Sequence, residues 1–115
     1  MAILAFISLN VLSQKEVKLD DIGKHVGDSV RVCDKVYGGI FLERRNGTPT
    51  FLNVGGSYSN HLLTIVIWPE VRKEFTEKPE EFYKDKKVCV VGKVELFRDK
   101  PQIVLHSKGQ IIINE

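Results

Sequence analysis

The sequence predicts an all-β fold, a small closed Greek-key barrel of five strands with one short helix between the third and the fourth strand. The first observation behind this prediction is a valine-rich strand pattern that occurs twice, at residues 30–36 and 88–94. A short polar step precedes each copy. The second observation is the order of patterns between the copies, because a hairpin-like stretch comes first and a short helical stretch follows it.

The composition fits one small domain. A chain of 115 residues with 43% hydrophobic and 28% charged residues can build a single core but not two. The net charge of +2 is mildly basic, which gives only weak support for a nucleic-acid partner. The two cysteines have no Cys-x-x-Cys spacing and the three histidines are far apart in sequence, so no zinc signature is present.

Residues 1–14 form an uncharged, largely apolar segment ahead of Lys15. It is too short to span a bilayer, which takes roughly 20 apolar residues. The segment resembles the apolar core and exit of a secretory signal peptide, although no Lys or Arg precedes the apolar run. The alternative is a first strand or helix packed on the barrel. We expect residues 15–115 to form the single domain, which is periplasmic or secreted if residues 1–14 are a signal peptide and cytoplasmic otherwise.

The first strand of the barrel is expected to bend. Ahead of it, residues 17–27 carry apolar side chains at the spacing of one or two helical turns, which would plug one end of the barrel. From about Ser29, valines alternate with other residues in the period of a half-buried strand. Gly38-Gly39 lies inside this strand and marks a bulge or bend, which the first strand of a small barrel needs in order to cross both halves.

The remaining elements follow from turn residues and apolar runs. Asn46-Gly47 predicts a hairpin turn. Pro69 breaks a strand and suits the first position of a helix, and Pro79 begins a second short helical turn. The expected strands after the hairpin are residues 50–54, 62–68, 87–96 and 102–106, with residues 111–113 as a last apolar strand or cap.

Five strands, a bent first strand and a helix after the third describe the oligonucleotide/oligosaccharide-binding (OB) fold. Residues 88–94, followed by 101–105 and 110–111, resemble the closing half of OB-fold domains of the nucleic-acid-binding, tRNA-anticodon-like type. Residues 50–55 are similar to the second-strand motif of that family, and the resemblance covers roughly residues 26–115. With the apolar segment at its start, the chain is similar to an exported bacterial member.

This resemblance implies a binding face for single-stranded nucleic acid. Family members typically bind single strands on the outer face of strands 2 and 3, between the loop joining strands 1 and 2 and the loop joining strands 4 and 5. Aromatic rings there can stack on bases, and basic loop residues can hold phosphates. Carried over by position, the candidate ligand-binding residues are Tyr37, Arg44, Arg45, Phe51, Asn53, Tyr58, Thr64, Trp68, Arg98 and Lys100.

These candidates also have plain structural interpretations. A change of register by one residue would turn Phe51 into the core. Trp68, beside Pro69, can pack under the helix instead of reaching solvent, and the loop arginines can be ordinary solvated charges. Gly55-Gly56 stands where the anticodon-binding version has an Arg-Asp pair, so the resemblance does not carry over specific base reading.

The sequence shows no catalytic or metal-binding constellation. The staphylococcal-nuclease branch of OB folds needs clustered carboxylates and phosphate-binding arginines, and no such set surrounds strands 1 to 3. No nucleophile–base pair is present either, so we expect no enzyme activity, no metal and no cofactor. Three function classes stay open: a single-stranded nucleic-acid-binding module, an envelope domain that binds a protein or peptide through an open strand edge, and a sugar-binding or other ligand-binding domain.

Cys33 and Cys89 lie in strands 1 and 4, which are antiparallel neighbours in this topology. Both are out of phase with the inward valines and so share the outer face. A disulfide needs Cα atoms within about 7 Å, and aligning the two strand patterns does not make the cysteines directly opposite. Two outcomes stay open: two separate, partly buried thiols, or a bridge that forms and persists if the chain matures in an oxidising compartment.

Overall fold

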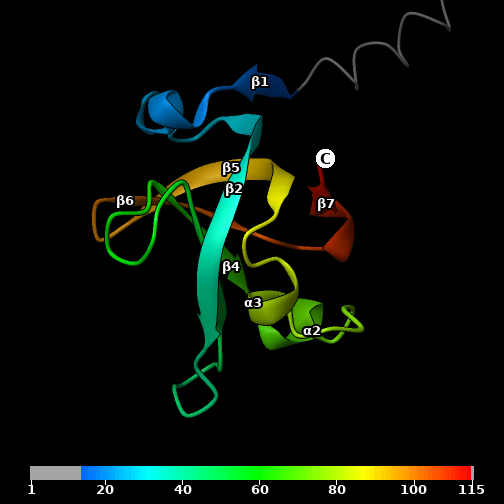
Figure 1. Ribbon diagram of the computed structural model, residues 1–115. Helices are drawn as coiled ribbons and strands as arrows, with labels where there is room; N and C mark the ends of the chain where they lie inside the picture. Colours follow the sequence, from blue (N-terminus) through cyan, green and yellow to red (C-terminus); the bar gives the residue numbers. More distant parts are fainter. Residues whose placement is uncertain (1–13, 115) are drawn as a thin grey trace, which may run out of the picture.

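The computed structural model describes residues 14–114, which fold into a mostly β structure (Figure 1). Apart from Gln14, the segment interpreted above as a signal peptide or a packed apolar element lies outside the described residues. Within them, no helix is long and apolar enough to cross a membrane. The strands are β1 (Lys15–Val17), β2 (Ser29–Phe41), β3 (Thr50–Val54), β4 (Leu63–Ile67), β5 (Lys87–Phe97), β6 (Lys100–Val104) and β7 (Ile111–Ile113).

Five of these strands pair in a ring. β2 pairs with β3, β3 with β4, β4 with β6, β6 with β5, and β5 pairs back with β2. All of these pairs are antiparallel except β4–β6. Two short strands add to the five of the ring: β1 pairs parallel with β2, and β7 pairs antiparallel with β5. β1 was not predicted, because its three residues are too few to show the alternation of a strand. β7 was foreseen, because a last strand at residues 111–113 was one of the two expected outcomes.

Helical segments cover the two ends of the strand ring (Figure 1). The 3₁₀ helix η1 (Leu19–His25) buries Leu19 and Ile22 against the core, as expected for the lead-in. At the other end, α2 (Pro69–Arg72) and α3 (Pro79–Phe82) lie between β4 and β5, and each begins at the proline that the sequence indicated. A short 3₁₀ helix, η2 (Lys108–Gln110), precedes β7.

β2 bends where the glycine pair predicts a bulge. Its pairing with β3 shifts register between Val36 and Gly38, so Tyr37 is the extra residue of the bulge. At Gly39 a side chain would collide with the carbonyl oxygen of Phe51 on β3, which explains why this position needs glycine. The bend lets the first half of β2 pair with β5 and the second half with β3.

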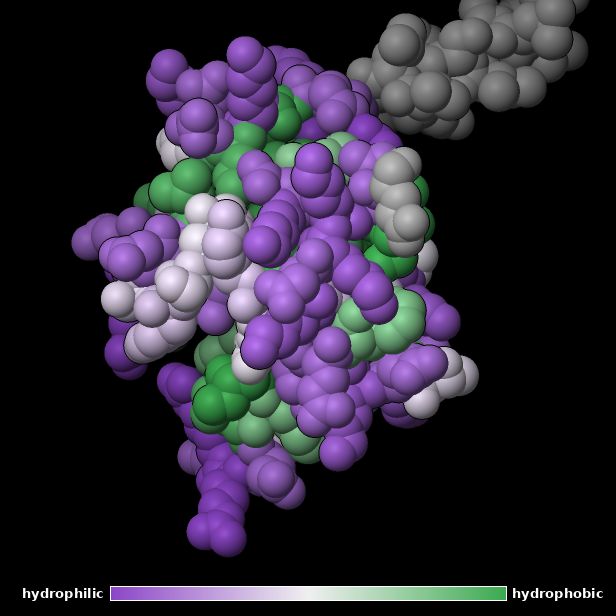
Figure 2. All heavy atoms as spheres, in the orientation of Figure 1, coloured by the Kyte–Doolittle hydropathy of each residue, from purple (hydrophilic) through white to green (hydrophobic). Residues whose placement is uncertain are grey.

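The connections differ from prediction in detail. The Asn46-Gly47 turn lies within a longer connection, residues 42–49, which protrudes at the bottom of Figure 1 and is strongly hydrophilic in Figure 2. By contrast, the loop expected at 97–101 is shorter, because only Arg98 and Asp99 separate β5 from β6. Both residues have positive φ, 52° and 66°. A two-residue hairpin turn requires this when it matches the right-handed twist of the strands that it joins.

Cys33 and Cys89 form a disulfide, with their Cα atoms 4.0 Å apart. The two residues are direct partners in the antiparallel ladder between β2 and β5. Val36, three residues further along β2, forms its backbone hydrogen bonds on the β5 side. The side to which the backbone N–H and C=O groups point alternates with each residue, so those of Cys33 point away from β5. Cys33 and Cys89 therefore form a pair without mutual backbone hydrogen bonds. Such pairs bring Cα atoms closest, so the structure has a bridge and not two separate thiols. Aligning the two strand patterns in the same direction did not place the cysteines opposite each other, because antiparallel pairing reverses one of the two copies.

Candidate ligand-binding face

The outer face of β3 and β4 carries side chains in the phase that the sequence predicts. On β3, Leu52 and Val54 are fully buried in the core. Phe51 and Asn53 alternate with them and so face outward. Phe51 is only partly buried, and it is absent from the core cluster of the described residues. The register predicted from alternation is therefore the one observed, and the alternative that placed Phe51 in the core was wrong.

Side chains from three strands line up across this face. Asn53 on β3 pairs with Thr64 on β4, and Thr64 pairs with Gln102 on β6. Directly opposite residues on neighbouring strands point to the same face, so their amide and hydroxyl groups form one polar row. Next to this row, Ile40 on β2 is the partner of Phe51.

Together these residues form the floor of an open hollow of about 280 Å³. The loop between β3 and β4 and the turn between β5 and β6 form its sides. Seven of the ten predicted residues line the hollow: Arg45, Phe51, Asn53, Tyr58, Thr64, Arg98 and Lys100. The sequence reasoning missed Ile40, Ser59, His61, Phe97, Pro101 and Gln102.

Three predicted residues are not part of the hollow. Tyr37 lies at the β2 bulge and lines a different groove. Arg44 sits in the exposed connection 42–49 and is not among the residues that line the hollow. Trp68 follows the end of β4, is 40% exposed, and lies against Gly47 of that connection. The alternative that Trp68 packs under the helix was also wrong, because its side chain is exposed and lies against Gly47.

The charge of the hollow comes from three basic side chains and no carboxylate among its lining residues. The Arg45 guanidinium lies 6.0 Å from the centre of the Phe51 ring, and that of Arg98 lies 5.2 Å from the Phe97 ring. The Lys100 ammonium donates a hydrogen bond to the carbonyl oxygen of Ser59 at 3.2 Å, which joins the two loops. The hollow thus combines aromatic faces with positive charge.

His61 is the polar residue that the sequence did not single out. Its Nε2 lies 2.9 Å from the Thr64 hydroxyl, and its ring stacks on Tyr58 with centroids 5.8 Å apart. Burial lowers the pKa of His61 below the ordinary value of 6.5, and the nearby charge of Lys100 lowers it further. His61 is therefore neutral at pH 7 and adds a hydrogen-bonding ring, not a charge. A histidine three residues before a strand threonine was the only sequence signal for this pair.

Asn53 has the most confined polar group of the row. It is 9% exposed and lines the hollow. Buried amides normally have partners. Since the residue lines the hollow, the opening of the hollow is where a partner can reach its amide.

Comparison with known proteins bears on the fold alone. No protein-family model matches the chain, and no curated protein matches it. Among solved structures, a protein described as an aspartyl-tRNA synthetase from Leishmania major Friedlin is similar, with a TM-score of 0.54 and 12% identity over 89% of this chain. The S. pombe Stn1-Ten1 complex is similar with a TM-score of 0.51 and 17% identity over 76% of this chain.

The chain spans only part of those proteins, 21% of the first chain and 58% of the second. At these identities the similarity establishes an OB-like, mostly β architecture and carries no residue-level correspondence.

Proposed function

We propose that this chain is a non-catalytic OB-fold module that binds single-stranded nucleic acid in the hollow on the outer face of β3 and β4. The observation that carries the proposal is the union of aromatic rings and three cations, with no carboxylate in the lining. Bases stack on aromatic rings whatever their identity, and basic side chains neutralise phosphates.

The geometry assigns a part to each group. Phe51 and the 81% exposed Tyr58 offer ring faces for bases. Arg45 on one side and Arg98 and Lys100 on the other lie where the two flanking loops of an OB domain hold a backbone. The polar row of Asn53, Thr64 and Gln102 lies between them and can accept or donate hydrogen bonds to base edges.

The non-catalytic part of the proposal rests on the same lining residues. His61 bonds to a threonine and has no carboxylate beside it in the hollow, so it lacks the orienting group of a general base. The ring of strand pairings supports the finer proposal of a closed, five-stranded Greek-key barrel. One structural neighbour is named for its tRNA substrate, which agrees with a nucleic-acid partner.

Fluorescence anisotropy with a labelled oligo-dT at low salt tests the proposal. Loss of one base-stacking ring costs about 1–3 kcal/mol, so Phe51→Ala is expected to weaken binding about 5- to 150-fold. Tyr37→Ala is the matched control, because Tyr37 is an aromatic residue outside the hollow and its loss is expected to change nothing. Wild-type protein that does not bind, or equal losses in both variants, would contradict the proposal.

A further inference from the structure

Among residues 14–114, the second half of β2 has one edge without a neighbouring strand. Toward β5, the last backbone contacts are at Val36, whose N–H donates to the Lys86 carbonyl at 2.9 Å and whose carbonyl accepts from Asp85 at 2.7 Å. Beyond the bulge, β3 on the other edge is the one strand of the described part of the chain that pairs with β2. Residues 37–41 therefore present a free edge on the β5 side.

The direction of each backbone group follows from the ladder. The N–H of Leu42 donates to the Pro49 carbonyl, on the β3 side. Since hydrogen-bonding direction alternates along an antiparallel strand, Ile40 also turns toward β3 while Gly39 and Phe41 turn away from it. The N–H and C=O groups of Gly39 and Phe41 have no hydrogen-bond partner within residues 14–114. Four aligned backbone groups are thus available to a ligand.

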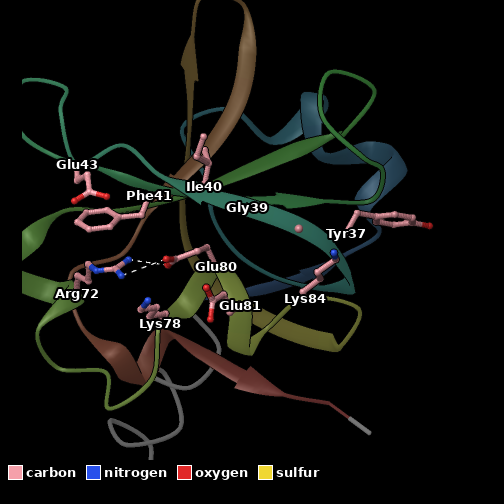
Figure 3. A pocket seen from close by; sticks show the side chains of 11 residues that line it. Tyr37, Gly39, Ile40, Phe41, Glu43, Arg72, Lys78, Glu80, Glu81 and Lys84 are labelled. Atoms are coloured by element: carbon pink, nitrogen blue, oxygen red, sulfur yellow. Dashed lines mark hydrogen bonds and ion pairs between the residues drawn. The ribbon is translucent and has the colours of Figure 1, made fainter.

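These groups border a groove of about 780 Å³ between the β2 edge and α3 (Figure 3). Figure 3 shows β2 crossing above the groove and the side chains of Glu80, Glu81 and Lys84 below it. Arg72 closes one end, where its guanidinium lies 3.7 Å from the centre of the Phe41 ring. The groove is therefore bounded by backbone on one side and by a helix on the other.

The outer side of the edge offers space for an apolar side chain. A Cβ at Gly38 would meet nothing within 4 Å, so the strand surface is open there. Tyr37 and Ile40 flank this gap and are 41% and 51% exposed. An aromatic residue on a neighbouring strand can cover such a glycine, as designed sheets use aromatic side chains to cover edge glycines.

The charges around the groove balance. Arg72 and Glu80 pair with each other at 2.8 Å. The other charged lining residues are Lys78 and Lys84 against Glu43 and Glu81, two of each sign. A polyanion gains no electrostatic attraction from such a lining, unlike from the basic hollow. A strand of low net charge is complementary to the balanced charges of the groove.

We propose that this groove binds an extended peptide segment of a partner protein, which adds to the free edge of β2 as a further strand. Its backbone pairs with Gly39 and Phe41, an aromatic side chain lies over Gly38 between Tyr37 and Ile40, and its net charge is near zero. Strand addition of this kind derives its affinity from main-chain hydrogen bonds and its specificity from alternate side chains. The site is separate from the nucleic-acid hollow, although Ile40 borders both.

Hydrogen exchange on the ¹⁵N-labelled, disulfide-intact protein tests the proposal. The probe is an acetylated and amidated nine-residue peptide of alternating threonine and valine, with a central phenylalanine and one lysine and one glutamate at its ends. We expect this peptide to slow exchange of the Gly39 and Phe41 amides at least tenfold. Two control peptides carry N-methyl groups on every second residue, one in each phase, and one of the two is expected to lose the effect.

Two protein variants separate the groove from the hollow. Tyr37→Ala is expected to weaken peptide binding several-fold, and Arg45→Ala to leave it unchanged. The proposal is overturned if the two amides exchange equally fast with and without the peptide, or if both methylated peptides act like the parent. It is also overturned if the amides are protected without peptide and light scattering gives the mass of a dimer, because the occupant is then a second copy of this chain.

Discussion

The hollow and the groove adjoin at Ile40, in the second half of β2, and they differ in which chemical groups they present. The hollow presents side chains, among them three cations with no carboxylate in its lining, whereas the groove presents unpaired backbone groups above balanced charges. The pairing of β2 with β5 ends just before the bulge at Tyr37, whereas the pairing with β3 continues beyond it. The second half of β2 thus has a side chain in the hollow, Ile40, and a main-chain surface along its edge.

The largest expected effect is a loss of stability of the fold that carries both regions, caused by removing the disulfide between Cys33 and Cys89. Cross-linking residues 56 apart in sequence stabilises a fold by roughly 4 kcal/mol through the entropy of the unfolded chain. The double variant Cys33→Ser/Cys89→Ser is expected to lose about that free energy of unfolding, measured by urea titration. Oligonucleotide binding is expected to persist in the folded fraction, because the bridge touches neither region. A loss below about 1 kcal/mol would show that the bridge does not hold the two strands together.

The next effect belongs to the groove alone. Burial by itself would raise the pKa of Glu80, but the hydrogen bond from Arg72, a backbone hydrogen bond and the charges of Arg72 and Lys78 together outweigh burial and hold the pKa below the ordinary value of 4.5. A lowered carboxyl pKa stabilises the fold above the unfolded-state pKa, and this stabilisation is lost as the pH falls through the folded-state pKa. Glu80→Gln is therefore expected to cost about 2 kcal/mol at pH 7 and progressively less below pH about 4.5.

Urea titrations across pH check this prediction, with Glu81→Gln as the matched control because Glu81 is exposed and makes no ion pair within residues 14–114. Arg72 also donates to the Thr50 hydroxyl at 2.7 Å, so it retains one partner in the variant. Oligonucleotide affinity is expected to stay at the wild-type value. A cost for Glu80→Gln that is independent of pH would mean that the ion pair contributes nothing beyond packing.

The smallest effect separates two neighbouring arginines. Each phosphate contact to a single strand contributes about −0.7 to the slope of log affinity against log salt concentration, so three contacts give about −2. Arg45→Ala is expected to make the slope less negative by about 0.7, because Arg45 lines the hollow. Arg44→Ala is expected to leave the slope unchanged, because Arg44 lies outside the hollow. Anisotropy titrations at several salt concentrations would contradict the assignment if the two variants gave the same slope.

The sequence predicted the long elements well because their signals are local. Alternating valines fixed the phase of β2 and β5, and proline marked the first residues of α2 and α3. The outward phase of Phe51 and Asn53 followed from the buried alternation of Leu52 and Val54.

The sequence failed where the answer depends on how distant segments meet. Register between β2 and β5 decides that Cys33 faces Cys89, and no local pattern encodes register. The connection at residues 42–49 meets Trp68 at Gly47, a contact between segments about twenty residues apart that no local pattern indicates. Gln102 enters the hollow because β6 lies beside β4, which pairs Thr64 with a residue far along the chain.

Chemical-shift mapping of the ¹⁵N-labelled protein with single-stranded oligo-dT tests the central claim most directly. The claim is that nucleic acid binds the side-chain surface of β3 and β4 and leaves the β2 edge free. We predict that the amides of Phe51, Asn53, Thr64 and Lys100 shift on titration, while those of Gly39 and Phe41 stay in place. Shifts at Gly39 and Phe41 with none in the hollow would contradict the claim.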